Sequence, residues 1–194
     1  MKKEKSHVVT LRDSIIVELL FIIVSLFVIV FIRQQNIFNF ITAGISVGKQ
    51  VAYGLLIGIG ISLILFIVYR IKKSIISLNH LRVLTRSSDL SLLIAGILAG
   101  IGEEILFRGV IQYYTGIWIA SIIFMLAHAQ FWAKPPIEWG KMIYAVFAFS
   151  CGLLLGCLYL TAGLLCVITV HALIDSIAFI HLKRLFKDGS SEKQ

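Results

Sequence analysis

The stretch that decides the fold is residues 90–116, "LSLLIAGILAGIGEEILFRGVIQYYTG", an apolar run that carries two adjacent glutamates and an arginine. A transmembrane helix needs about 20 predominantly apolar residues, and this run supplies them. At the centre of a lipid-facing helix, Glu103, Glu104 and Arg108 would cost roughly 8–10 kcal/mol, of which the large apolar side chains return only about 4–7 kcal/mol. The sequence therefore predicts a membrane helix whose charged side chains point into a helical bundle or a wet cavity.

The rest of the chain also has the composition of a polytopic membrane protein. Of its 194 residues, 59% are hydrophobic and only 14% are charged, and the mean hydropathy of +0.96 lies outside the range of soluble domains. About six segments are apolar and long enough to be membrane spans, so we expect an all-α transmembrane bundle. These segments are 14–32, 51–69, 90 to about 114, 117–130, 142–160 and 164–182, the fourth being short.

We expect one membrane-embedded domain, residues 1–194, because no internal repeat is apparent and the connections are too short to hold a second domain. The first apolar segment follows a basic tail, as in a signal peptide, but it is too long for an h-region and no cleavage motif follows it. It is therefore expected to be the first retained span. Cys151, Cys157 and Cys166 have neither disulfide nor metal-site spacing, so we expect them to be packing residues.

Basic residues concentrate in alternate connections between the predicted spans. The net charge of +8 therefore indicates contact with anionic lipid head groups rather than nucleic acid, and the asymmetry predicts a multi-pass cell-membrane protein with both termini in the cytoplasm. Segment 70–86 fits either a helix on the inner membrane surface or a solvated basic loop. The cytoplasmic cations are Lys2, Lys3, Lys5, Arg12, Arg70, Lys72, Lys73, Arg82, Arg86, Lys134, Lys141, Lys183, Arg184, Lys187 and Lys193, against Arg33 and Lys49 outside.

The three charges of the opening stretch do not have equivalent positions. Glu104 and Arg108 are four residues apart on one helical face, with the glutamate on the N-terminal side, which favours an ion pair. Glu103 lies about 100° around the helix from Glu104 and about 140° from Arg108. The same arginine does not easily satisfy both carboxylates, so Glu103 needs another partner.

Hairpin geometry indicates what that partner is. The midpoint of Glu103 and His128 falls on Thr115 and Gly116, the expected turn between the third and fourth spans. Both residues should therefore lie at equal depth, about 18 Å from that turn. The spacing predicts that Glu103 and His128 face each other.

A second pair of polar residues lies in the last span. Measured from the next outer turn, centred on Ala162, His171 and Asp175 should lie about 14 and 20 Å deep on one helical face. Any one of these histidines alone is most simply a hydrogen-bonded packing residue. Two histidines, a glutamate and an aspartate in one layer, beside a paired glutamate and arginine, instead favour a functional site.

The ordered motifs resemble those of the CPBP intramembrane proteases, also called the Abi or CAAX prenyl endopeptidase family. The resemblance covers about 75 residues within a core of four helices, 90–182, so that 1–89 would add two spans and a basic cytoplasmic loop. Each motif alone is weak, but the three together are fairly specific. They are Glu-Glu-x-x-x-Arg at Glu103, Glu104 and Arg108, Phe-x-x-x-His at Phe124 and His128, and His-x-x-x-Asp at His171 and Asp175.

The resemblance implies a role for each motif. Glu103 and His128 match the positions that activate a water molecule for peptide hydrolysis, while His171 and Asp175 match those that stabilise the oxyanion. Asp175 departs from the asparagine that many members carry, because an ionised aspartate accepts hydrogen bonds and cannot donate to an oxyanion. It would act either in protonated form or by orienting His171.

Glu104 and Arg108 match the positions that hold such a site together. The set Glu103, His128 and His171 would also suit zinc with an open fourth position, but no His-Glu-x-x-His motif is present, and a metal-independent reaction without cofactor is preferred. The implied substrate is a peptide or a membrane-associated protein, as in peptide or bacteriocin maturation or self-immunity. A non-proteolytic membrane regulator or immunity protein, and a transporter with a proton relay, remain alternatives. The sequence does not indicate an oligomeric state.

Overall fold

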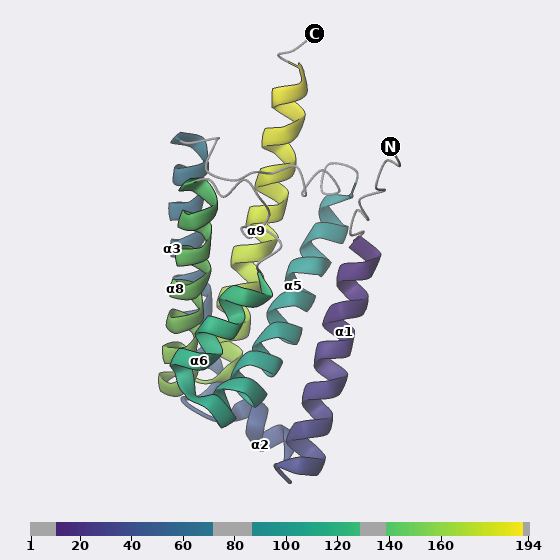
Figure 1. Ribbon diagram of the computed structural model, residues 1–194, viewed down its shortest axis with the longest axis vertical. Helices are drawn as coiled ribbons and strands as arrows, with labels where there is room; N and C mark the ends of the chain where they lie inside the picture. The colour runs from purple at the N-terminus through teal and green to yellow at the C-terminus, as the bar shows by residue number, and fades with distance from the viewer. Residues whose placement is uncertain (1–10, 72–86, 129–138, 192–194) are drawn as a thin grey trace, which may run out of the picture.

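The computed structural model describes residues 11–71, 87–128 and 139–191, and every regular element in these ranges is helical (Figure 1). The expected all-α fold is therefore confirmed. Two short π-helical turns, η1 and η3, continue α1 and α5. The elements are α1 Leu11–Phe27, η1 Val28–Ile32, α2 Ile37–Thr42, α3 Val47–Ile71, α5 Asp89–Leu106, η3 Phe107–Ile111, α6 Gln112–Ala127, α8 Trp139–Thr161 and α9 Leu164–Ser191.

Five helical runs within the described residues are long and apolar enough to cross a membrane, so the chain is a multi-pass membrane protein. The sequence predicted about six, because it counted 90 to about 114 and 117–130 separately. In the structure, the described part of both lies on one helical run. The five runs are Leu11–Ile32, Val47–Val68, Asp89–Ala127, Lys141–Thr161 and Leu164–Leu185.

The long run Asp89–Ala127 is a hairpin rather than a straight rod. Gly116 has φ 78° and ψ 170°, which interrupts the helix at the predicted turn, and the second arm of α6 turns back and packs against α8 (Figure 1). Residues 117–127 are about 16 Å long at 1.5 Å per residue, about half of a hydrocarbon core of roughly 30 Å. The fourth predicted span is thus too short to be counted as a span of its own, although its position after the turn was predicted correctly.

Helix α9 lies centrally, with α3 and α5 packed along it, while α1 packs on α5 and α8 on α6 (Figure 1). The contact between α5 and α9 uses small residues, as is common between membrane helices. A Cβ added to Gly100 would lie only 2.7 Å from the backbone nitrogen of Ala172. This close packing fixes the distance between the charged part of α5 and the polar part of α9.

Gln50 connects three segments at the end of the bundle where α2 and α3 meet. Its side chain is fully buried, and Nε2 donates to the carbonyl oxygens of Ala43 and Ile45 at 2.9 and 2.8 Å. Its Oε1 accepts from the backbone N–H of Leu165 at 3.0 Å. One side chain therefore satisfies backbone groups at the turn before α3 and at the start of α9.

Two sets of expectations have mixed outcomes. Cys166 is buried and Cys151 is half-buried, but Cys157 is exposed, so the expectation that all three pack in the core is wrong for Cys157. A cysteine is apolar enough to face lipid without cost. The predicted surface helix or basic loop, from residue 72 to residue 86, and Lys134 lie outside the described residues.

Candidate active site

The polar residues singled out in the sequence come from three parts of the chain. Glu103 and Glu104 lie on α5, Arg108 lies on η3, and His128 caps the C-terminal end of α6. His171 and Asp175 lie on α9. The hairpin at Gly116 and the α5–α9 packing bring these three parts of the chain together.

Glu104 is the centre of the most buried part of this cluster. Its Oε2 accepts a hydrogen bond from Arg108 Nε at 2.8 Å, and both side chains are fully buried. Its Oε1 lies 2.7 Å from His171 Nδ1. Because Nδ1 must donate here, the ring nitrogen that faces Glu104 carries a proton. The predicted Glu104–Arg108 pair is present, and His171 adds a link to α9 that the sequence spacing did not predict.

Arg108 also contacts Gln112 and Phe124. Its Nη1 donates to Gln112 Oε1 at 3.4 Å, and Gln112 Nε2 donates to the carbonyl oxygen of Gly156 on α8 at 3.1 Å. The guanidinium carbon also lies 5.5 Å from the ring centroid of Phe124, within the range of a cation–π contact. The π-helical turn η3 carries this arginine, and such turns often occur at functional sites.

Glu103 and His128 face each other across the hairpin, as the midpoint argument predicted. Glu103 Oε2 and His128 Nε2 are 3.8 Å apart, too far for a direct hydrogen bond. His128 Nδ1 lies 2.9 Å from the carbonyl oxygen of Phe124, to which it donates, so a neutral ring presents Nε2 as an acceptor toward Glu103. Glu103 Oε2 accepts no hydrogen bond from the described residues.

The second predicted pair, His171 and Asp175, is also in contact. His171 Nε2 lies 3.5 Å from Asp175 Oδ2, at the long limit of a hydrogen bond. The two nitrogens of His171 therefore face two different carboxylates, Glu104 and Asp175. This arrangement fixes the orientation of the ring from both sides.

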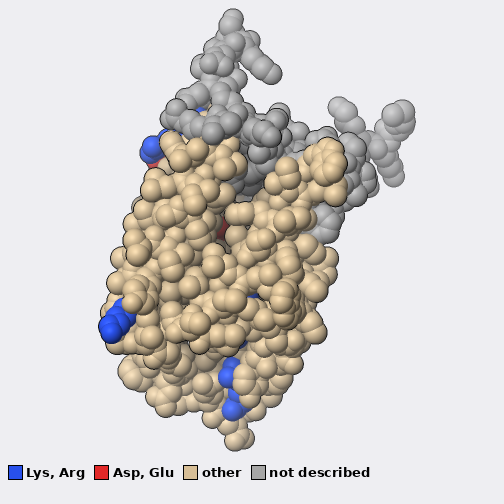
Figure 2. All heavy atoms as spheres, turned by 90° about the vertical axis from the view of Figure 1, so that its left-hand side faces the viewer, with Lys and Arg blue, Asp and Glu red and all other residues tan. Residues whose placement is uncertain are grey.

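Exposure divides the cluster into a closed and an accessible part. The side chains of Glu104 and Arg108 are fully buried and that of His171 is 6% exposed, whereas those of Glu103, His128 and Asp175 are 14%, 17% and 26% exposed. Figure 2 views the bundle from its α3 and α8 side and shows acidic atoms in a hollow of a mostly uncharged face, with basic atoms near its edge and in its lower part. Glu103, His128 and Asp175 are therefore the accessible members of the cluster, and Glu104 and Arg108 lie buried behind them.

The same residues do not fit a zinc ion in this arrangement. Within the described ranges, no group of three histidine, cysteine, aspartate or glutamate side chains converges closely enough to hold a metal. Of the three ligands considered from the sequence, His171 already uses Nδ1 to bind Glu104, and its Nε2 faces Asp175. Glu103 and His128 alone leave zinc with two protein ligands, fewer than the three of catalytic zinc sites.

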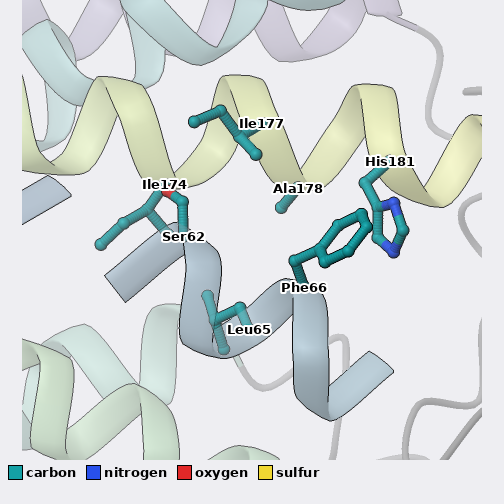
Figure 3. Close-up of a pocket in the computed structure, with 7 residues that line it drawn as sticks. All are labelled: Ser62, Leu65, Phe66, Ile174, Ile177, Ala178 and His181. Atoms are coloured by element: carbon teal, nitrogen blue, oxygen red, sulfur yellow. The ribbon is translucent and has the colours of Figure 1, made fainter. Parts of the chain in front are cut away.

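A separate small pocket lies between α3 and α9. Its lining is mainly apolar, with Ser62 on α3 and His181 on α9 as its polar members (Figure 3). The His181 ring contacts Phe66, with ring centroids 4.4 Å apart. The lining includes none of the residues of the charged cluster, so this pocket is not part of the candidate active site.

One acidic residue near the site was missed in the sequence. Glu18 lies on α1, is 9% exposed, and packs against Gly102 of α5, the residue before Glu103. The sequence contained a signal for it, because Glu18 is a charged residue within the first apolar segment. The insertion cost that singled out residues 103–108 applies to it equally.

Comparison with known proteins places most of these residues in one matched region. Residues 85–177 match the family model of Rce1-like type II CAAX prenyl endopeptidases. The uncharacterised protein YpbD of Bacillus subtilis (strain 168) is 35% identical over 94 residues, which make up 45% of this chain and 46% of that protein. The chain thus covers less than half of the length of this relative, and no solved structure matches it.

The matched region includes every residue of the three motifs and excludes α1, α3 and Glu18. It confirms the resemblance drawn from the motifs. Members of a protease family act on protein or peptide substrates. Residues 85–177 are therefore a domain of the Rce1-like type II CAAX prenyl endopeptidase family, a family of intramembrane proteases.

Proposed function

We propose that this protein hydrolyses a peptide bond within the membrane by a water molecule held between Glu103 and His128. One observation carries the proposal: two acceptor atoms, Glu103 Oε2 and His128 Nε2, face each other at 3.8 Å in a partly accessible hollow. One water molecule can donate a hydrogen bond to each of them. Such a water is oriented and already hydrogen-bonded to a base.

The reaction then follows general acid–base chemistry. Glu103 takes a proton from the water as its oxygen forms a bond to the peptide carbonyl carbon. In the second step, Glu103 passes the proton taken from the water to His128 Nε2, and His128 delivers it to the nitrogen of the leaving amine as the carbon–nitrogen bond breaks. Both groups lie within one water molecule of the reacting atoms, as general acid–base catalysis requires.

His171 and Asp175 are proposed to act on the developing oxyanion. Between the carboxylates of Glu104 and Asp175, His171 is proposed to carry a proton on both ring nitrogens, and the 3.5 Å separation of Nε2 from Asp175 Oδ2 leaves the Nε2–H weakly bound and able to donate to a reacting oxygen. Asp175 then orients His171 rather than binding the oxyanion itself, which removes the difficulty of an aspartate at this position. Glu104 and Arg108 support the site by fixing the other face of His171.

The substrate is proposed to be a peptide or a membrane-associated protein, with peptide or bacteriocin maturation or self-immunity as the biological setting. The whole chain is proposed to be one membrane-embedded domain in the cell membrane, with both termini in the cytoplasm. In support, α1 and α3 lie outside the family match but pack directly on α5 and α9.

The test compares cells that carry the wild-type chain, Glu103→Gln or His128→Gln by quantitative proteomics of membrane proteins and secreted peptides. Glu103→Gln keeps the shape but removes the base, so we expect an uncleaved precursor to accumulate in both variants. His181→Gln is the matched control, because that histidine lies in the separate α3–α9 pocket. If Glu103→Gln inserts normally and retains full biological activity, the alternative of a non-proteolytic regulator or immunity protein replaces the protease.

A further inference from the structure

Helix α1 buries two polar residues in the bundle. Most of its large apolar side chains are exposed, whereas Glu18 and Ser25, seven residues apart on one face, are buried. Glu18 Oε2 accepts no hydrogen bond from any residue that the structure describes. A carboxyl group inside a membrane span is costly and normally has a partner or a function.

Glu18 lies directly beside the candidate active site. A Cβ added to Gly102 would lie 2.5 Å from Glu18 Oε2 and 2.9 Å from its carbonyl oxygen, so α1 approaches α5 at this point as closely as a glycine allows. The next residue is Glu103, whose Oε2 is likewise buried without a hydrogen bond within the described ranges. Two carboxyl groups with unmet hydrogen-bonding capacity therefore occupy neighbouring positions of the α1–α5 contact.

A count of charges shows which of these carboxyl groups has no basic partner. Each of the other three acidic residues of the cluster has a basic side chain within 4 Å, and Glu18 has none in the described chain. The pairs are Glu104 with Arg108, Glu103 with His128, and Asp175 with His171. Two neighbouring buried carboxyl groups do not both ionise, because like charges repel and each charge is costly in a low dielectric, and Glu18, which lacks even a histidine, is the one that keeps its proton. A protonated carboxyl group is also a hydrogen-bond donor.

We propose that Glu18 is a second carboxyl group of the Glu103 site, a positioning residue that donates its proton in a hydrogen bond to Glu103, directly or through one water molecule. This inference rests on the proposed proteolytic function. The hydrogen bond is charge-assisted and therefore short and strong, and it holds Glu103 as the carboxylate that accepts a proton from the attacking water. The site would then depend on a helix outside the region that matches the family.

The first experiment needs no substrate. Infrared spectra of the purified full chain in lipid vesicles at neutral pH should contain the carbonyl-stretch band of a protonated carboxyl group. Glu18→Gln should remove this band, and Glu103→Gln should shift it to higher frequency, because the acceptor of the hydrogen bond loses its charge. Ser25→Ala, which changes the other buried polar residue of α1, should leave it unchanged. A band that survives Glu18→Gln, or that does not shift in Glu103→Gln, would overturn the pairing.

The second experiment measures how fast the precursor that accumulates in Glu103→Gln cells is processed. Glu18→Leu removes the donor without adding polarity, and we expect processing to slow about ten- to hundredfold, the value of one hydrogen bond to a charged group. Thermal stability should not fall, and Glu18→Gln, which keeps an N–H donor, should restore most of the rate. These two readouts separate a positioning role from a structural one.

The outcomes for Glu18 and for the protease are distinguishable. If Glu103→Gln accumulates a precursor and Glu18→Leu processes it at the wild-type rate, the role of Glu18 is wrong and the proteolytic function stands. If Glu103→Gln accumulates nothing, the proteolytic function fails, and the infrared band alone decides whether Glu18 and Glu103 are paired.

Discussion

At the scale of single residues, Glu104 makes the charged cluster tolerable inside a membrane. Both of its oxygens are engaged, one by Arg108 at 2.8 Å and the other by His171 at 2.7 Å, and the first pair is fully buried. Burying two charges is costly, and their attraction offsets that cost only when the geometry is good. Removing one partner therefore lowers the free energy of unfolding more than removing both, because it leaves a buried charge without a partner.

Arg108→Met should lower the free energy of unfolding by about 3–5 kcal/mol, the usual cost of breaking a buried pair. The double variant Glu104→Gln, Arg108→Met should recover most of this loss, since no charge is then left without a partner. Chemical unfolding in detergent micelles, followed by circular dichroism, measures both. Arg12→Met, at an exposed position of α1, is the control and should leave stability unchanged. Additive losses in the double variant would show that the two residues do not interact.

At the scale of elements, the α5–α6 hairpin was predictable because the depth of a residue depends only on how many residues separate it from the turn. Equal distances from Thr115 and Gly116 place Glu103 and His128 opposite each other, and i,i+4 spacing places His171 beside Asp175, as the structure has them. The rotation of each helix about its axis was not predictable. In a membrane both faces of a helix are apolar, so the pattern does not indicate which side meets which neighbour. The contact of His171 with Glu104 was missed for this reason.

Gly116→Ala tests how strictly the hairpin sets the site. The backbone at Gly116, φ 78° and ψ 170°, is almost exclusive to glycine, and a side chain there should cost about 1–3 kcal/mol in stability. A hairpin that relaxes from this strain should also move His128 away from Glu103 and reduce processing of the accumulated precursor. Gly60→Ala is the control, because a Cβ there meets nothing within 4 Å in an ordinary helix. Equal melting temperatures for the two variants would contradict the assigned role of the turn.

At the scale of the whole molecule, the sequence predicted a helical bundle and the structure changed the number of spans. The difference lies in 117–130, which composition alone marks as a short span but which forms the returning arm of a hairpin up to Ala127. Consecutive helices still alternate in direction when 117–127 is read as one arm of a hairpin. The start of α1 and the C-terminal end of α9 lie at one end of the bundle, and the turn between α2 and α3 lies at the other (Figure 1).

This arrangement, together with the distribution of basic residues, predicts which end faces the cytoplasm. Arg12 lies at the start of α1 and Lys49 at the start of α3, and both are exposed. In a chain from which Cys151, Cys157 and Cys166 have been removed, Lys49→Cys should react with a membrane-impermeant maleimide on intact cells. Arg12→Cys should react only after the membrane is permeabilised, because cytoplasmic connections carry the excess of lysine and arginine. The reverse labelling pattern would place both termini outside. Reaction of both cysteines on intact cells would mean that the starts of α1 and α3 lie on the same side of the membrane, which would contradict the bundle described above.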